Sequence, residues 1–80
     1  MTITDAVAKR IDEYLFSREI TLYKLAKDSG LPVASLQNLY RGNTKTPTVG
    51  LVCKVCAGLN ISLTEFFNSP IFTATELELD

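Results

Sequence analysis

The segment from Thr21 to Gly42 constrains the fold of this chain more than any other part of the sequence. It holds two short stretches with helical apolar spacing, separated by Gly30, which can take a positive φ angle without a steric penalty. Two helices that cross steeply over such a short turn need a small residue at the crossing and apolar residues beneath the second helix. The residues that suit these roles are Leu25, Ala26, Gly30, Leu31, Leu36 and Leu39. The segment therefore predicts a helix-turn-helix.

The sequence on both sides of this motif is also predicted to be helical. A first helix is expected over residues 5–17, with Thr4 or Asp5 as its cap, because apolar residues recur there every four positions. The motif itself supplies a helix between Thr21 and Gly30 and a helix over residues 32–40, with Pro32 in the first turn of the latter. A fourth helix follows a cap at Thr48 and runs to Leu59, and a fifth follows the capping-box pair Ser62 and Glu65. Together the five predicted helices fill residues 5–68, so the expected fold class is all-α.

A chain of 80 residues has room for a single domain with a compact core. We expect a helix-turn-helix domain over residues 1–69, with its motif at 21–42, and an acidic tail over residues 70–80. This tail is expected to be flexible or to contact a dimer partner, and Leu77 and Leu79 alternate with acidic residues as in a strand-like arm. The longest stretch of low polarity, 49–63, is interrupted by polar residues and is too short for a membrane span. With no secretory signal pattern at its start either, the protein is expected in the cytoplasm.

The two cysteines, Cys53 and Cys56, are spaced as in zinc and redox motifs. A structural zinc ion needs four ligands, and the chain has no histidine and no third cysteine, so a metal would have to be shared between chains. A redox pair needs a stabilised thiolate, whereas these residues are predicted in the middle of an apolar helix. We therefore expect two buried core thiols, with redox or intersubunit metal chemistry as the alternatives.

The charge of the chain is unevenly distributed although its formal net value is only −1. Between Ile20 and Asn60 there are five basic residues and a single acid, Asp28, while both ends of the chain are acidic. Such segregation would direct one face of the molecule to a polyanion. A solvated face with no partner explains the same pattern equally well.

The residues after the motif, YRGNTKTPTVGLVCKVCAGLNISLTEFF, contain an arginine–glycine turn, a loop that ends in proline and a hydroxyl cap, and two further capped helices. Together with the motif, this order resembles the phage repressor, Cro and XRE family of helix-turn-helix regulators over nearly the whole folded chain. The resemblance implies a compact five-helix lambda-repressor-like domain with a short C-terminal tail. It further implies a transcriptional regulator, in this case a repressor, that binds double-stranded DNA without a cofactor, a metal or a small-molecule ligand.

In this family the third helix enters the major groove and reads base edges. Carried onto this sequence, the resemblance implies base reading by Val33, Ala34, Gln37 and Asn38. The two amide side chains can pair bidentately with adenine, and the two apolar ones offer methyl contacts to thymine. Contacts to phosphate are implied for Thr21, Ser35, Arg41, Asn43, Thr44, Lys45 and Thr46.

This chain also departs from the family pattern. Many members have a glutamine where this sequence has Leu22, so we expect the neighbouring Tyr23 to contact phosphate instead. The apolar pair Val33 and Ala34 and the acidic overall charge predict weaker or less stringent binding than that of a typical basic repressor. Gln37 and Asn38 also suit a solvated helix surface, and Arg41 also suits a helix cap.

Dimers are the usual state of this family, because two recognition helices read a symmetric site. Four residues near the C-terminus exceed what a five-helix core should absorb, and they predict an exposed dimer interface: Phe66, Phe67, Ile71 and Phe72. Leu77 and Leu79 would serve as arms of the same interface.

Two other function classes compete with DNA binding. An enzyme is not expected, because the chain has no histidine, no base beside Ser35 or the cysteines, and no glycine-rich phosphate loop. The serious alternative is a protein interaction module, in which the same fold binds a partner such as a toxin or a polymerase subunit. The acidic pI of about 5.3 and the apolar pair on the proposed reading face motivate this alternative.

Overall fold

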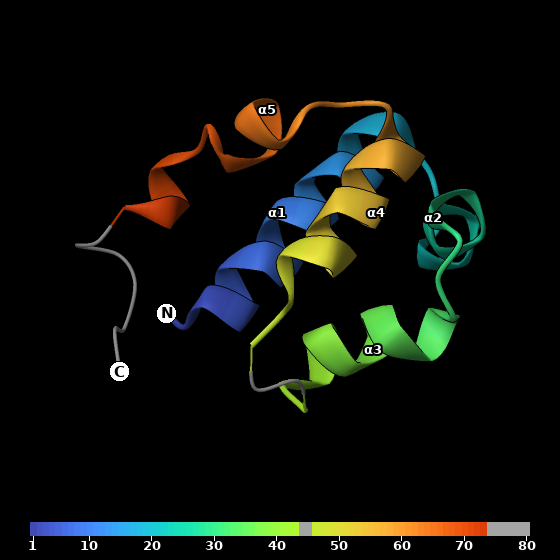
Figure 1. The fold of residues 1–80 in the computed structure, drawn as a ribbon, viewed down its shortest axis with the longest axis horizontal. Coiled ribbons are helices and arrows are strands. Elements are labelled where there is room, and N and C mark those ends of the chain that lie inside the picture. Colours follow the sequence, from blue (N-terminus) through green and yellow to red (C-terminus); the bar gives the residue numbers. More distant parts are fainter. Residues whose placement is uncertain (44–45, 74–80) are drawn as a thin grey trace.

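A series of short helices makes up the part of the chain that the computed structural model describes, residues 1–43 and 46–73. The elements in order are α1 (Ile3–Arg18), α2 (Leu22–Ser29), α3 (Val33–Arg41), α4 (Val49–Leu59), α5 (Leu63–Phe67) and a 3-10 helix, η1 (Pro70–Phe72) (Figure 1). The described residues contain no strand. The predicted all-α, five-helix fold is thus confirmed, and η1 adds a short turn within residues 70–80.

Hydroxyl side chains begin most of these helices. Thr21, Thr48 and Ser62 each accept a hydrogen bond from the backbone N–H three residues later, at 3.0–3.1 Å, as their positions in the sequence predict. The cap predicted for the first helix was wrong. Helix α1 begins two residues earlier than expected because Thr2 and Asp5 form a reciprocal capping box. Pro32 precedes α3 in an extended conformation and does not lie in its first turn.

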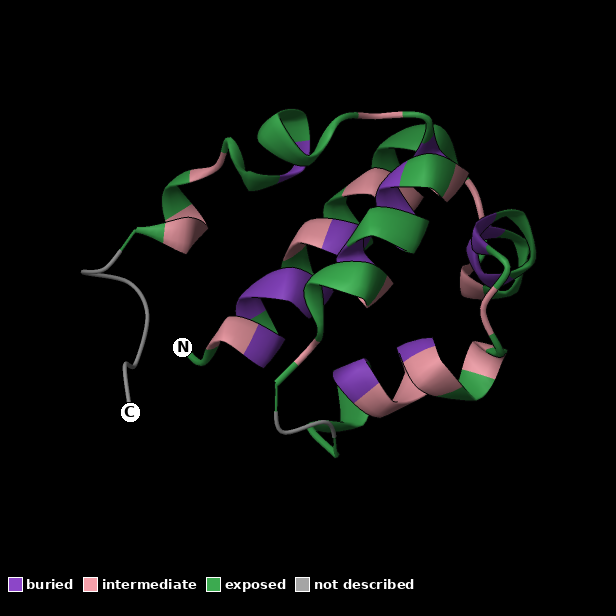
Figure 2. Ribbon diagram, viewed as in Figure 1, coloured by how far each residue is buried: buried purple, intermediate pink, exposed green. Residues whose placement is uncertain are grey.

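Helices α1 to α5 all contribute apolar residues to the core, from one in α5 to four each in α1 and α4. The largest fully buried side chains are Val7, Ile11, Leu25, Leu36, Leu39, Val55, Leu59 and Phe66. Figure 2 shows that buried positions on the helices face the centre of the molecule, while exposed positions face outward. Because α1 and α2 both pack on α3, the latter is held from two sides.

Helices α2 and α4 make the most extensive contact of the fold, and they meet at Gly58 and Ser29. A Cβ atom at Gly58 would lie 3.0 Å from the Ser29 backbone nitrogen, 3.1 Å from its Cα atom and closer still to its hydroxyl. The Ser29 side chain is buried, and its hydroxyl has no hydrogen-bond partner among the described residues. The crossing therefore depends on the missing side chain at position 58.

Helix α5 is attached to α1 by polar side chains as well as by Phe66. The Arg10 guanidinium donates hydrogen bonds of 2.8 Å to the backbone carbonyls of both Glu65 and Phe66. The Tyr14 hydroxyl is 3.1 Å from a Glu65 carboxylate oxygen, and the Arg10 guanidinium lies 4.9 Å from the Tyr14 ring centroid. These contacts satisfy carbonyls at the end of α5 that have no partner within the helix.

Two expectations about buried residues need correction. Cys56 is buried, but Cys53 is exposed on the outer side of α4, so only one of the two thiols belongs to the core. The prediction that Phe66 belongs to an exposed patch was wrong, because its side chain has no accessible surface. The rings of Phe67 and Phe72 cover it at centroid distances of 5.2 and 5.9 Å.

None of the helices in the described ranges is long and apolar enough to cross a membrane.

Candidate nucleic-acid interface

The turn between α2 and α3 consists of Gly30, Leu31 and Pro32. Gly30 has a φ angle of +68°, and the Leu31 N–H donates a 2.9 Å hydrogen bond to the Ala26 carbonyl, which closes the end of α2. Leu31 packs partly buried against the core, and the extended Pro32 directs the chain into α3. Glycine is thus favoured at the one position of the turn that has a positive φ angle.

Helix α3 has a buried side and an outward side. Leu36 and Leu39 are 0% and 1% exposed, and they fix the helix to the core that α1 and α2 also contact. Ala34 and Arg41 are exposed, while Ser35, Gln37 and Asn38 are half-buried. Of the predicted reading residues, Val33 is the one that also packs against the core. The outward side thus carries both amide side chains of the helix, and Arg41 lies in its last turn.

A side-chain contact joins this outward side of α3 to α2. The Gln37 Nε2 atom lies 3.5 Å from the Tyr23 hydroxyl, and Tyr23 is 65% exposed. Two residues that the sequence analysis assigned separately, one to a base and one to a phosphate, are therefore neighbours.

A second contact ties α3 to α1. The Tyr40 hydroxyl lies 3.4 Å from an Asp12 carboxylate oxygen. Burial raises the pKa of Tyr40 well above its usual value, and the Asp12 charge and hydrogen bond raise it further. Tyr40 therefore stays protonated and donates to Asp12 at neutral pH. The sequence does not predict this pair, because the two residues are 28 positions apart and show no shared pattern.

The residues predicted to contact phosphate lie at the ends of α2 and α3 and in the loop that follows. The Thr21 oxygen already accepts a bond from the Lys24 N–H, which leaves its hydroxyl proton to donate to a phosphate oxygen. Arg41 is exposed and forms no ion pair with any of the described residues. Asn43 and Thr46 are exposed, whereas the predicted residues Thr44 and Lys45 lie outside the described residues.

One cation of the helix-turn-helix has an acidic neighbour. Lys24 on α2 forms a 2.9 Å ion pair with Asp28 in the next turn. Exposed pairs of this kind contribute little to stability, but the carboxylate offsets the charge that a phosphate would meet. Arg41 has no such partner among the described residues, so the electrostatic part of any interaction with DNA at α3 depends more on Arg41 than on Lys24.

Of the residues predicted to form a dimer interface, three retain accessible surface. Phe67 is 41% exposed, while Ile71 and Phe72 are half-buried. The Phe67 and Phe72 rings pack edge to face, with centroids 4.8 Å apart. The predicted arms, Leu77 and Leu79, lie outside the described residues.

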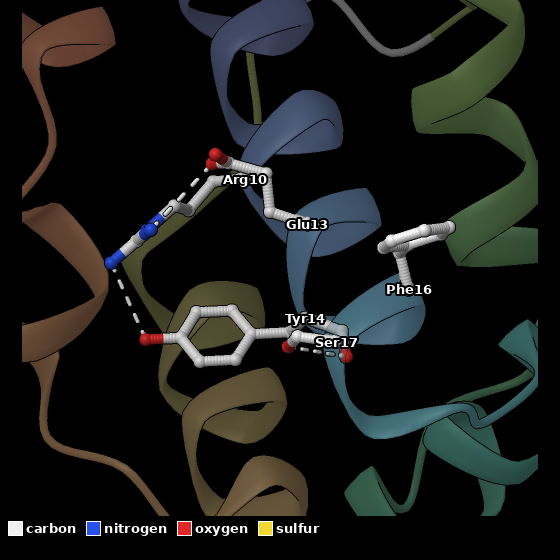
Figure 3. A pocket seen from close by; sticks show the side chains of 5 residues that line it. All are labelled: Arg10, Glu13, Tyr14, Phe16 and Ser17. Carbon is white, nitrogen blue, oxygen red and sulfur yellow. Dashed lines mark hydrogen bonds and ion pairs between the residues drawn. The ribbon is translucent and has the colours of Figure 1, made fainter.

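A hollow of about 400 Å³ lies on α1 (Figure 3). It is lined by Arg10, Glu13, Tyr14, Phe16 and Ser17. Arg10 and Tyr14 are already bound to each other and to α5, and Phe16 points away from them in Figure 3. The described part of the chain holds no group of three or more histidine, cysteine, aspartate or glutamate residues that could bind a metal ion.

Comparison with known proteins agrees with this arrangement. A family model described as a Cro/C1-type HTH DNA-binding domain matches residues 10–70, which include α2, α3 and the turn between them. No match was found among curated proteins or among solved structures.

Proposed function

The chain belongs to the Cro/C1-type HTH DNA-binding domain family, and we propose that it is a sequence-specific transcriptional repressor that places α3 in the major groove. The observation that carries this proposal is the two-sided character of α3. Leu36 and Leu39 hold the helix in place, while the polar outward side is left for a ligand. The proposed action is binding alone, with no catalytic step, and its place is the cytoplasm.

In the proposed complex the outward residues of α3 read the bases. Gln37 and Asn38 each present a donor and an acceptor, which is what bidentate pairing with adenine requires. Ala34, and Val33 with the surface it retains, would contact thymine methyl groups. Because Val33 also packs against the core, we expect it to contribute less to base discrimination than the two amides.

Phosphate contacts would flank this reading helix on both sides. Thr21 and Tyr23 begin α2, where free backbone N–H groups also favour an anion. Ser35 lies in the first turn of α3, and Arg41, Asn43, Thr44, Lys45 and Thr46 follow along its end and the next loop. These groups would position the helix without reading sequence.

We also propose that the protein acts as a homodimer through Phe67, Ile71 and Phe72. These residues leave apolar surface accessible next to the core, and a symmetric DNA site requires two copies of α3 about 34–36 Å apart, one turn of DNA. Light scattering at high protein concentration tests this part. A monodisperse monomer there would exclude the interface.

DNA binding is tested by fluorescence-anisotropy titration of random genomic duplex DNA at low and at physiological salt. The wild type is compared with the double variant Asn38→Ala/Arg41→Ala and with a control, Lys54→Ala/Asn68→Ala, which removes one cation and one amide from exposed positions outside α3. We expect salt-sensitive binding that the first variant loses and the control largely keeps. Equal loss in both variants would argue against α3 as the interface.

A second candidate is a protein interaction module, and the exposure of Phe16 favours it. This side chain is 88% exposed near the end of α1, where it lines the hollow in Figure 3 and can contact a partner. The same titration separates the two functions. If the folded protein binds no duplex even at low salt, a partner protein becomes the better explanation.

A further inference from the structure

The contact between Tyr23 and Gln37 crosses the helix-turn-helix from α2 to α3. The hydroxyl and the amide nitrogen are 3.5 Å apart, at the long end of the range for a hydrogen bond. Tyr23 is 65% exposed, so the contact does not serve to bury the ring. A long hydrogen bond at an exposed position contributes little to the stability of the fold. Its main effect is on the orientation of the two side chains.

Orientation matters for Gln37 because its two amide ends have opposite hydrogen-bonding characters. In the major groove adenine presents an acceptor, N7, beside a donor, N6, whereas guanine presents two acceptors, N7 and O6. A glutamine selects adenine only if its oxygen meets N6 while an amide hydrogen meets N7. The nitrogen and oxygen are nearly equal in size, so packing alone does not choose between the two amide orientations.

The Tyr23 hydroxyl can make this choice because it has a single proton to donate. If that proton goes to a DNA phosphate, the hydroxyl can only accept a bond from Gln37. The amide nitrogen must then face Tyr23, as it does here, and its second hydrogen and the Oε1 atom remain for a base.

We infer that Tyr23 is a specificity-determining positioning residue: by donating to phosphate and accepting from Gln37, it fixes the amide in the orientation that prefers adenine. This inference rests on the proposed function and deepens it. It gives Tyr23 a part in reading sequence in addition to its contact with phosphate.

The experiment selects bound duplexes from a randomised pool and sequences them for the wild type, Tyr23→Phe, Gln37→Ala and the double variant. Bidentate pairing discriminates between bases by roughly 5- to 150-fold, so Gln37→Ala should abolish a preference of this size at one base pair. We expect Tyr23→Phe to lower the adenine preference at that same base pair by about threefold or more. The double variant should show no further loss there beyond that of Gln37→Ala.

Tyr40→Phe is the matched control, since it removes the same atom from α3 at a hydroxyl that contacts Asp12. It should leave the base preferences unchanged. Thermal unfolding of Tyr23→Phe should match that of the wild type, which shows that the variant is folded.

The outcomes separate this inference from the function on which it rests. Full adenine preference in Tyr23→Phe, or a loss of affinity that is equal for all sequences, would overturn the role of Tyr23 and leave DNA binding intact. If the wild type enriches no duplex at low salt, the proposed function itself fails.

Discussion

At the scale of single residues, Gly58 illustrates how much can depend on an absent side chain. Nothing in the sequence predicts this role, because a glycine inside an apolar helix has no signature of a close crossing. Its importance follows only from the position of Ser29, which belongs to a helix 29 positions earlier in the chain. The glycines at 30 and 42, by contrast, end helices through a local positive φ angle, and local sequence predicts them.

The substitution Gly58→Ala should destabilise the protein by about 1–3 kcal/mol, because the new methyl group would force α2 and α4 apart. Gly50→Ala in the same helix is the control, since the nearest side-chain atom there would lie at 3.8 Å. It should be neutral or stabilising by up to about 1 kcal/mol through helix propensity. Urea unfolding measures both variants, and equal stabilities would contradict the close crossing.

The two thiols should differ in reactivity although they are three positions apart. Cys53 is exposed, whereas burial raises the pKa of Cys56 and the nearby Cys53 and Glu65 charges raise it further. A raised thiol pKa means less reactive thiolate at pH 8. With Ellman's reagent we expect Cys53 to react about tenfold or more faster than Cys56 in the folded protein. Cys53→Ser should remove the fast phase and Cys56→Ser should keep it; two equally fast phases would contradict this prediction.

At the scale of helices, local signals predicted three of the caps that local contacts determine, but not the Thr2–Asp5 capping box of α1. The caps Thr21, Thr48 and Ser62 could be identified because each bonds a residue three positions away. Contacts between distant parts of the chain could not be predicted. Phe66 was assigned to the surface because the sequence does not show that α5 folds back over α1, where Arg10 meets it 56 positions away.

The attachment of α5 gives a prediction at this scale. Arg10→Met keeps most of the apolar stem but leaves the carbonyls of Glu65 and Phe66 without their donor, so we expect a loss of about 1–3 kcal/mol. Hydrogen exchange should accelerate first at amides of α5. Lys9→Met, at the neighbouring exposed position, should change neither the free energy of unfolding nor the exchange rate of α5. If α5 exchanges at the wild-type rate in Arg10→Met, the hydrogen bonds do not hold the helix.

At the scale of the whole molecule, the small number of cations in the proposed interface predicts that DNA affinity depends only weakly on salt concentration. Each neutralised phosphate contributes about 0.9 to the slope of log K against log salt concentration. Because Arg41 and Lys45 are the two cations of the proposed interface, we expect a slope of about −2 for each chain, and Arg41→Ala should reduce its magnitude by about 1. Anisotropy titrations over a range of salt concentrations measure the slope for the wild type and for Arg41→Ala. A slope steeper than about −5 for each chain would mean that cations outside the proposed interface take part.

The two sides of α3 have a consequence for how proteins of this design can evolve. Leu36 and Leu39 are buried and fix α3 to the core, while Ala34 is exposed and Gln37 and Asn38 are only half-buried. Substitutions at these outward positions change few core contacts, so most of them should fall within about 0.5 kcal/mol of neutral stability. A lineage could therefore exchange one genomic target for another by a few mutations without passing through an unfolded intermediate.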